Sequence, residues 1–171
     1  MAVSDRSRED VAELLSALSG RYGSVAVDQT TTALPPAAYE EARKRFADGK
    51  VACAGVWIED DEGRVLLVND DDRTNRWAEP GGAIEADESL EAGAARWVEQ
   101  TTGYRCRIDD VKRVSIVGIG DERNVDRPPV YQLQVLFSGA LSGDKLELGE
   151  RVAGVEWWQD PPATIADALP A

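Results

Sequence analysis

The sequence predicts an α/β domain with a mixed sheet and an N-terminal helical extension, and three observations support this prediction. Residues 50–69 and 105–158 contain short runs rich in β-branched and aromatic residues, bounded by turn residues. A single helical stretch of roughly four turns, near residues 87–102, separates these two regions. Two further segments with helical spacing precede residue 49. Strands on both sides of a central helix are typical of an α/β arrangement.

The charge balance is strongly acidic. The chain of 171 residues has 32 acidic and 19 basic residues, a net charge of −13, and only 4 of the basic residues are lysines. In molar salt the Debye length falls to about 3 Å, which screens the self-repulsion of such a surface. We therefore expect a salt-adapted cytoplasmic protein, with an ordinary acidic protein as the alternative. The same surface disfavours nucleic acid as a partner, because phosphate-backbone binding depends on Lys and Arg displacing counterions.

Other residue types exclude further classes of function. No apolar run approaches the ~20 residues that span a bilayer, so the sequence predicts a soluble intracellular protein without a membrane partner. The chain contains no histidine, which excludes His-based catalytic triads and His-containing zinc sites. Cys53 and Cys106 lie apart in strand-like contexts, and we expect both to be buried free thiols.

Residues 1–48 have the pattern of an extension packed on a main domain of residues 49–171. A first helix is expected to begin with Ser7 as its N-cap and to stop at Gly20. Residues 24–32 alternate like a short strand, and two prolines then introduce a second helix that ends near Gly49. The extension could cover an edge of the core, bridge a homodimer or form part of a pocket.

The main domain begins with strands. Residues 50–58 and 64–70 flank an acidic turn and predict a hairpin. After the central helix, three β-rich segments follow at residues 105–120, 130–141 and 152–158, and prolines introduce a short terminal helix at residues 161–169. In the pair Trp157 and Trp158, strand alternation predicts one packed and one exposed side chain.

The central stretch, PGGAIEADESLEAGAARWVEQTTGY, extends from Pro80 to Tyr104. Its Pro-Gly-Gly predicts a tight turn whose backbone can approach a ligand closely. Asp87 or Ser89 can cap the helix that follows, and Gly103 occupies a position typical of a helix C-terminus.

The spacing within this stretch resembles the box of the Nudix (MutT-like) hydrolase family. Matching positions are Gly82, Glu88, Arg96, Val98 and Gly103, and the preceding Trp-Ala-Glu-Pro-Gly-Gly resembles the usual entrance to the box. The resemblance covers roughly residues 50–160. It implies an α/β/α sandwich that hydrolyses nucleoside diphosphate-linked substrates, using Mg²⁺ or Mn²⁺ held by glutamates of the helix.

Three of those glutamates are replaced, by Trp97, Gln100 and Thr101. Positions 97, 100 and 101 share one helix face, and none of the new side chains carries a negative charge. Glu99 points away from that face, where a solvated or arginine-paired acid is expected. We therefore expect weak or absent Mg²⁺-dependent hydrolysis. The alternative is a catalytically silent module that binds a nucleotide or another phosphorylated ligand, or a protein partner, on the Nudix fold.

The resemblance implies supporting roles for Glu88 and Arg96 in shaping the box. A metal ion could instead be held by other acids, namely Glu79 and Glu85 near the glycines, and Asp121 and Glu122 in a distant loop. The alternative for Glu79 and Glu85 is that both are solvated surface acids. Arginines can hold phosphates and tryptophans can stack on a base. The candidates for ligand binding are Arg73, Arg76, Trp77, Gly81, Gly82, Trp97, Gln100 and Arg123.

Overall fold

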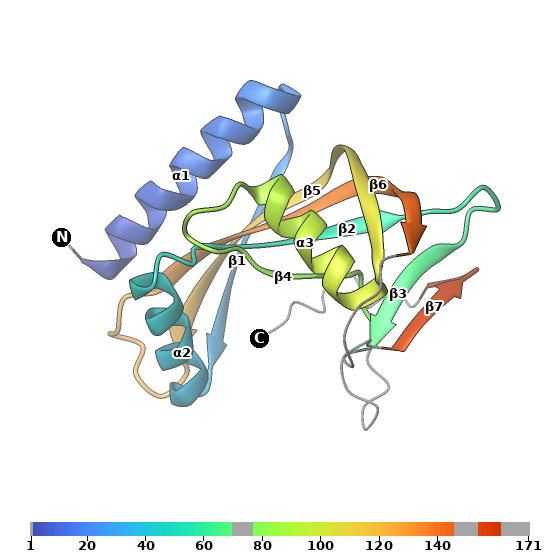
Figure 1. Cartoon of the computed structure of the whole chain (residues 1–171). Coiled ribbons are helices and arrows are strands. Elements are labelled where there is room, and N and C mark those ends of the chain that lie inside the picture. The colour runs from blue at the N-terminus through green and yellow to red at the C-terminus, as the bar shows by residue number, and fades with distance from the viewer. Residues whose placement is uncertain (1, 70–76, 146–153, 162–171) are drawn as a thin grey trace. The chain divides into compact units, whose positions relative to one another are not determined.

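The computed structural model describes residues 2–69, 77–145 and 154–161, and these residues form helices and strands in a mixed order (Figure 1). The predicted α/β class is confirmed, and two helices lie within residues 1–48. None of the described helices is both long and apolar enough to cross a membrane. The elements are α1 (Val3–Tyr22), β1 (Val27–Leu34), α2 (Pro36–Ala47), β2 (Ala52–Ile58), β3 (Val65–Asn69), β4 (Gly81–Ala83), α3 (Leu90–Thr102), β5 (Tyr104–Asp121), β6 (Val130–Lys145) and β7 (Gly154–Trp158).

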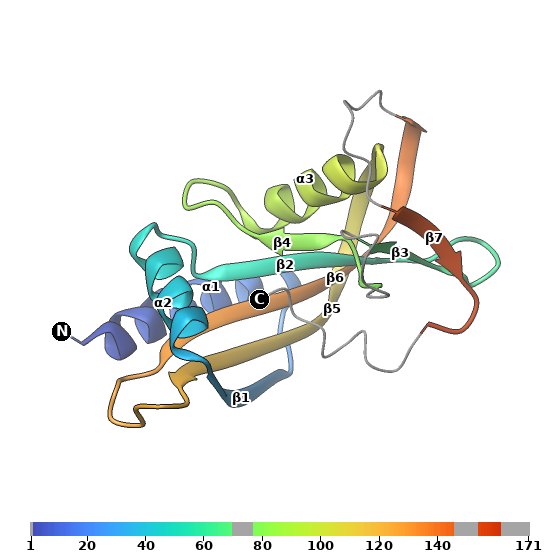
Figure 2. The same cartoon turned by 90° about the horizontal axis from the view of Figure 1, so that it is seen from below.

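The strands form two sheets (Figure 2). The larger sheet has five strands in the order β1-β5-β6-β2-β4, and the smaller consists of β3 and β7. Strand β1 runs parallel to β5, with Val27 opposite Val114, whereas β3 and β7 are antiparallel, with Val65 opposite Trp158. The mixed sheet expected from the sequence is therefore present.

The predicted hairpin of residues 50–70 is only partly formed. Its turn is present, because the N–H of Asp60 donates to the carbonyl O of Arg64 at 2.9 Å and Gly63 has a φ of +78°. Beyond the bridge between Glu59 and Val65, however, β3 pairs with β7 and β2 pairs within the larger sheet. All five residues of β3 are buried, so both faces of this strand are covered.

The chain divides into two compact units. Unit 1 consists of residues 1–53, 83–90 and 113–135, and unit 2 consists of residues 54–82, 91–112 and 136–171. One core cluster of unit 1 lies between α2 and the strands, and the hydroxyl of Tyr39 donates from it to the carbonyl O of Pro128 at 2.6 Å. The buried members of this cluster are Tyr39, Ala42, Val117, Ile119 and Val130.

Helix α1, which the sequence predicted to start at Ser7 and stop at Gly20, spans Val3–Tyr22. Ser7 lies inside the helix and is fully buried, and its hydroxyl accepts a hydrogen bond of 3.0 Å from the backbone N–H of Tyr131. The N-cap prediction was wrong because Ser7 lies inside α1, where its hydroxyl donates to the carbonyl O of Ser4 at 3.1 Å while it accepts from strand β6. Gly23, with a φ of +82°, lies at the C-terminal end of α1.

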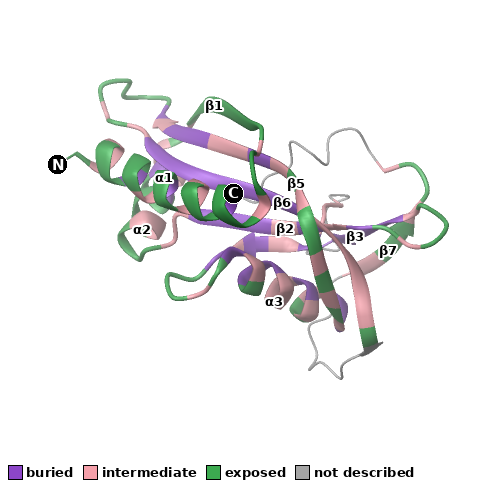
Figure 3. Cartoon of the chain, turned by 90° about the horizontal axis from the view of Figure 1, so that it is seen from above, coloured by how far each residue is buried: buried purple, intermediate pink, exposed green. Residues whose placement is uncertain are grey.

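Strand β1 confirms the strand expected between the two helices, but it has no buried face. Its first seven residues are exposed and Leu34 is half-buried (Figure 3). Because β1 stands at the end of the strand order, its outer edge has no strand partner among the described residues. The second helix, α2, starts at Pro36 and ends before Gly49, which has a φ of +80°, as expected.

Unit 2 contains the smaller sheet and all of the central helix except its first residue, Leu90. Leu90, Ala94 and Val98 of α3 are buried, and the helix is followed by Gly103 with a φ of +77°, as predicted. Trp158 is half-buried against the cluster of Val65 and Leu67, whereas Trp157 is exposed, which confirms the alternation of this pair. The terminal helix predicted at residues 161–169 lies outside the described residues apart from its first proline.

Candidate functional site

Gly81 and Gly82 lie in strand β4, not in the predicted tight turn, and neither has a positive φ. Glycine is required at both positions by close packing. A Cβ atom on Gly81 would lie 2.5 Å from the carbonyl O of Ala54, and one on Gly82 would lie 2.5 Å from Cε2 of Trp97. The close backbone approach predicted for these glycines is therefore made to the protein itself, because β2 and α3 occupy the space on either side.

Trp97 covers Gly82 from helix α3. The three atoms nearest to a Cβ position on Gly82 all belong to the Trp97 indole, at 2.5, 2.6 and 3.0 Å. The guanidinium carbon of Arg96 lies 5.1 Å from the centroid of the Trp97 ring, within the range of a cation–π contact. The helix thus presents an aromatic ring and an adjacent cation beside Gly82.

The other two substituted positions of the helix offer no charged oxygen. The hydroxyl of Thr101 donates to the carbonyl O of Trp97 at 2.7 Å, so it is used within the helix backbone. Gln100 is exposed and carries a neutral amide. The carboxylate of Glu99 lies 3.8 Å from Nε of Arg105. Glu99 is thus paired with an arginine, which is one of the two states expected for it.

Glu85 and Glu88, both in unit 1, form a turn before the helix. The carboxylate of Glu88 accepts a hydrogen bond of 2.9 Å from the backbone N–H of Glu85, and the N–H of Glu88 donates to the carbonyl O of Glu85 at 3.2 Å. The carboxylate of Glu85 is exposed and lies 3.5 Å from the ammonium group of Lys50. Glu88 therefore holds the shape of this loop, and Glu85 forms a surface ion pair.

Asp121, a metal-ligand candidate, is buried and already bound by the protein. Its carboxylate accepts from the backbone N–H of Arg123 at 2.9 Å and lies 3.2 Å from the guanidinium of Arg127. Arg127 also pairs with Glu40 of α2. The hydrogen bond that Arg127 donates to Glu40 is the largest cause of its raised pKa; burial opposes this rise, and the hydrogen bond to Asp121 adds to it. Glu122 and the side chain of Arg123 are exposed.

The remaining candidates do not assemble a metal centre. Among the residues that the structure describes, no group of three or more His, Cys, Asp or Glu side chains could hold a metal ion. Glu79 is half-buried. Trp77 packs on Trp158, with ring centroids 5.7 Å apart, in the apolar cluster of unit 2. Arg73 and Arg76 lie outside the described residues.

A family model for the NUDIX domain matches residues 49–167, which is more than half of the chain. The chain belongs to the Nudix family. The matched range includes the stretch from Gly82 to Tyr104, whose spacing resembles the Nudix box, and helix α3 lies within that stretch.

Three known proteins illustrate the extent of the similarity. A MutT-like protein of Streptomyces ambofaciens is 41% identical over 64 residues, which are 37% of this chain and 40% of that protein. Nucleoside diphosphate-linked moiety X motif 6 of Xenopus laevis is 39% identical over 59 residues, which are 34% of this chain and 27% of that protein. The matches therefore span less than half the length of these curated relatives. The crystal structure of an ADP-ribose pyrophosphatase of Streptococcus suis has a TM-score of 0.47 and 19% identity, covering 67% of this chain and 78% of that chain.

The two cysteines of this Nudix chain are free thiols. Cys53 is buried, as expected, and its sulfur accepts a hydrogen bond of 2.9 Å from the amide of Gln132. Burial raises the pKa of Cys53. Cys106 is half-buried, and burial, with a smaller effect of the Glu99 carboxylate, raises its pKa to about 11. Neither thiol is poised as a nucleophile, since the reactive form is the thiolate.

Proposed function

We propose that this Nudix protein has weak or no Mg²⁺-dependent diphosphate hydrolysis and binds a small phosphorylated ligand or nucleotide without cleaving it efficiently. The observation that carries the proposal is the packing of Trp97 on Gly82. The box pattern assigns a metal-binding carboxylate to position 97. An indole offers a single N–H donor and no oxygen, so it cannot replace that carboxylate.

The chemistry of the other two positions supports the same conclusion. Mg²⁺ requires oxygen ligands at about 2.0–2.1 Å in near-octahedral geometry, and carboxylates compensate for its lost hydration. Gln100 and Thr101 offer only neutral oxygens, and the Thr101 hydroxyl already donates to Trp97. Losing such ligands commonly lowers metal affinity or activity by orders of magnitude.

Two observations support a phosphorylated ligand. The indole of Trp97 offers an aromatic surface on which a base can stack, and Arg96 adds a cation that suits a phosphate oxygen. One relative is named for nucleoside diphosphate-linked compounds, which supports the same class of ligand for this chain.

The competing function is a working hydrolase whose metal is held by Glu79, Glu85, Asp121 and Glu122. Family membership favours it. The bonds from Arg123 and Arg127 to Asp121 weigh against it, because they occupy oxygen lone pairs that a metal would need. A measurable metal site in the wild-type protein distinguishes the two functions.

The test combines metal and ligand titrations in molar KCl. Calorimetry of the full chain with MgCl₂ and MnCl₂ is expected to show no saturable binding, and release of AMP from ADP-ribose should stay far below an ordinary enzyme rate of about 1 per second. ADP-ribose binding, followed by tryptophan fluorescence, should saturate and persist in excess EDTA. The variants Trp97→Ala and Arg96→Gln should weaken ADP-ribose binding. The matched variant Arg43→Gln, which changes an exposed arginine of α2, should not weaken it.

Each outcome decides between the alternatives. Metal-dependent hydrolysis at the ordinary rate contradicts the loss of the metal centre and supports the competing hydrolase. Failure of ADP-ribose, AMP and pyrophosphate to bind saturably contradicts a phosphate-binding module.

We further propose a homodimer formed through the outer edge of β1. This strand contains neither lysine nor proline, two residues that commonly protect exposed edges from pairing, and seven of its residues are exposed. Antiparallel pairing of two copies would continue the sheet across a two-fold axis. Light scattering should then report a dimer for the wild type and a monomer for Thr30→Lys/Thr32→Lys. A wild-type monomer at high concentration contradicts this arrangement.

We also propose a salt-adapted cytoplasmic setting for the protein. The net charge of −13 and the preference for arginine over lysine support it. Thermal unfolding in dilute buffer and in molar KCl tests the salt dependence.

A further inference from the structure

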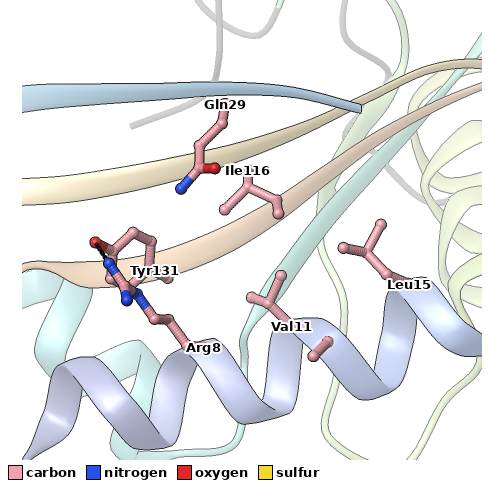
Figure 4. A pocket seen from close by; sticks show the side chains of 7 residues that line it. Arg8, Val11, Leu15, Gln29, Ile116 and Tyr131 are labelled. Atoms are coloured by element: carbon pink, nitrogen blue, oxygen red, sulfur yellow. Dashed lines mark hydrogen bonds between the residues drawn. The ribbon is translucent and has the colours of Figure 1, made fainter. Parts of the chain in front are cut away.

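A cavity of about 270 Å³ lies in unit 1, between α1 and the strands β1, β5 and β6. It is lined by Arg8, Val11, Ala12, Leu15, Gln29, Ile116 and Tyr131 (Figure 4). None of these residues belongs to the Nudix box. Its volume lies just below the range of about 300–1,000 Å³ that is typical of pockets for drug-sized ligands, which suits a smaller ligand of roughly ten heavy atoms.

The walls of the cavity are apolar along most of their length. Val11 and Leu15 extend from successive turns of α1 toward the strands, and Ile116 extends from β5. Val11 is 2% exposed, whereas Leu15 and Ile116 are half-buried, so the apolar wall continues from the core to the opening. Such a wall favours an apolar ligand tail, because the tail removes these side chains from water.

One end of the cavity is polar and carries a single charge. The guanidinium of Arg8 lies 4.5 Å from the centroid of the Tyr131 ring and donates to the Tyr131 hydroxyl at 2.6 Å. These two contacts fix the position of the cation beside the opening. Gln29 of β1 adds a neutral amide on the strand side.

Arg8 has no carboxylate within ion-pairing distance among the residues that the structure describes, although the chain has 32 acidic residues. Its remaining N–H donors are available, since Tyr131 accepts from only one nitrogen. A fixed arginine without an acid, next to an apolar wall, is complementary to an anionic group on an apolar tail.

We propose that this cavity binds a small monoanion with an apolar tail, such as a medium-chain carboxylate. The carboxylate pairs with the guanidinium of Arg8, and the tail lies along Val11, Leu15 and Ile116. This site is independent of the function proposed for the Nudix box, because it shares no residue with it.

The experiment uses the full chain with octanoate as the probe and calorimetry as the readout. Binding is expected to saturate with a dissociation constant of about 0.1–1 mM, which is typical of a small ligand with few contacts. Acetate, which lacks the tail, and octanol, which lacks the charge, should each bind at least about tenfold more weakly. Amide resonances of Gln29 and Ile116 should shift on addition of octanoate.

Two variants and a matched control locate the site. Arg8→Gln should weaken octanoate binding at least about tenfold, and Ala12→Trp should abolish it by filling the cavity. Arg6→Gln removes another α1 arginine, one that lies 5.6 Å from the Phe46 ring outside the cavity, and should leave binding within about twofold. The proposal is overturned if octanol binds as well as octanoate, if Arg8→Gln binds like the wild type, or if octanoate does not saturate the folded protein.

Discussion

The indole of Trp97 lies against the backbone of Gly82, so close that a Cβ atom on residue 82 would stand 2.5 Å from the ring. In the predicted alignment with the Nudix box pattern, Gly82 matches the glycine, whereas Trp97 stands where the pattern has an acid. The two positions are therefore coupled sterically: the ring can lie there only because residue 82 has no side chain.

This coupling predicts the outcome of a double-mutant cycle. Gly82→Ala should destabilise the protein by about 1–3 kcal/mol, as overpacking usually does. In the presence of Trp97→Ala the same substitution should cost at least about 1 kcal/mol less, because the clashing ring is gone. Urea unfolding measures both values. As a control, Gly20→Ala, where a Cβ meets nothing within 4 Å, should be neutral or stabilising. Additive costs would contradict the contact.

Restoring the carboxylates should restore a metal site. The triple variant Trp97→Glu/Gln100→Glu/Thr101→Glu places three acids on one face of α3, and we expect it to gain saturable Mg²⁺ binding by calorimetry. Hydrolysis can remain poor, because the groups that orient the ligands are not restored with them. The charge-matched control Ser16→Glu/Ala17→Glu/Ser19→Glu, on exposed positions of α1, should bind no Mg²⁺. Equal Mg²⁺ binding by parent and folded triple variant would refute the prediction.

Arg127, which is half-buried, should matter more for stability than the exposed arginines. Its guanidinium lies 3.2 Å from Asp121, whose side chain is 4% exposed. Arg127→Ala leaves this buried carboxylate without its cation, and we expect the thermal midpoint to fall by about 5 °C or more. Arg43→Ala, which removes an exposed pair with Glu40 at 3.9 Å, should change the midpoint little. Similar effects of the two variants would show that the Asp121 pair is not stabilising.

Cys106 should react slowly with iodoacetamide near neutral pH. Burial and the Glu99 carboxylate raise its pKa to about 11, so the thiolate becomes abundant only in strongly alkaline solution. At pH 8 the native protein should alkylate roughly 100-fold more slowly than the unfolded chain, whose thiols have pKa values of about 8.5. Glu99→Gln should lower the pKa and accelerate the reaction. Mass spectrometry of the Cys106 peptide separates it from Cys53, and a native rate independent of pH between 8 and 10 would oppose the assignment.

The acidic surface predicts stabilisation by salt. Self-repulsion at a net charge of −13 should be screened as the Debye length shrinks, so the thermal midpoint should rise by several degrees from dilute buffer to molar KCl. Circular dichroism at constant pH measures the change. An unchanged midpoint would remove the case for salt adaptation.

The ends of two helices and the position of α3 were predictable from residues that are close together in the sequence. Gly49 and Gly103 follow their helices with positive φ, as a glycine after a helix usually does, and both ends were predicted. The fixed spacing from Gly82 to Gly103 likewise predicted α3 and placed positions 97, 100 and 101 on it.

Contacts between distant segments were not predictable in the same way. Ser7 resembles an N-cap, but its hydroxyl binds Tyr131, which lies 124 residues away. Strand β3 has a hairpin turn before it, yet pairs with β7 across a long stretch of chain. The hydrogen bond from Arg127 to Asp121 depends on the fold of the loop that joins them. The sequence contains both charged residues but does not indicate that they are in contact.

The tryptophans of the chain are confined to one of its two compact units. All 5 lie in unit 2, and unit 1 contains tyrosines but no tryptophan. Fluorescence excited at 295 nm therefore reports on unit 2 alone. The Trp77 and Trp158 rings, 5.7 Å apart and tilted by 56°, are also close enough for exciton coupling in circular dichroism, which gives the β3–β7 sheet its own optical signal. Loosening of unit 1 before unit 2 would leave this tryptophan fluorescence unchanged, and amide hydrogen exchange would detect it.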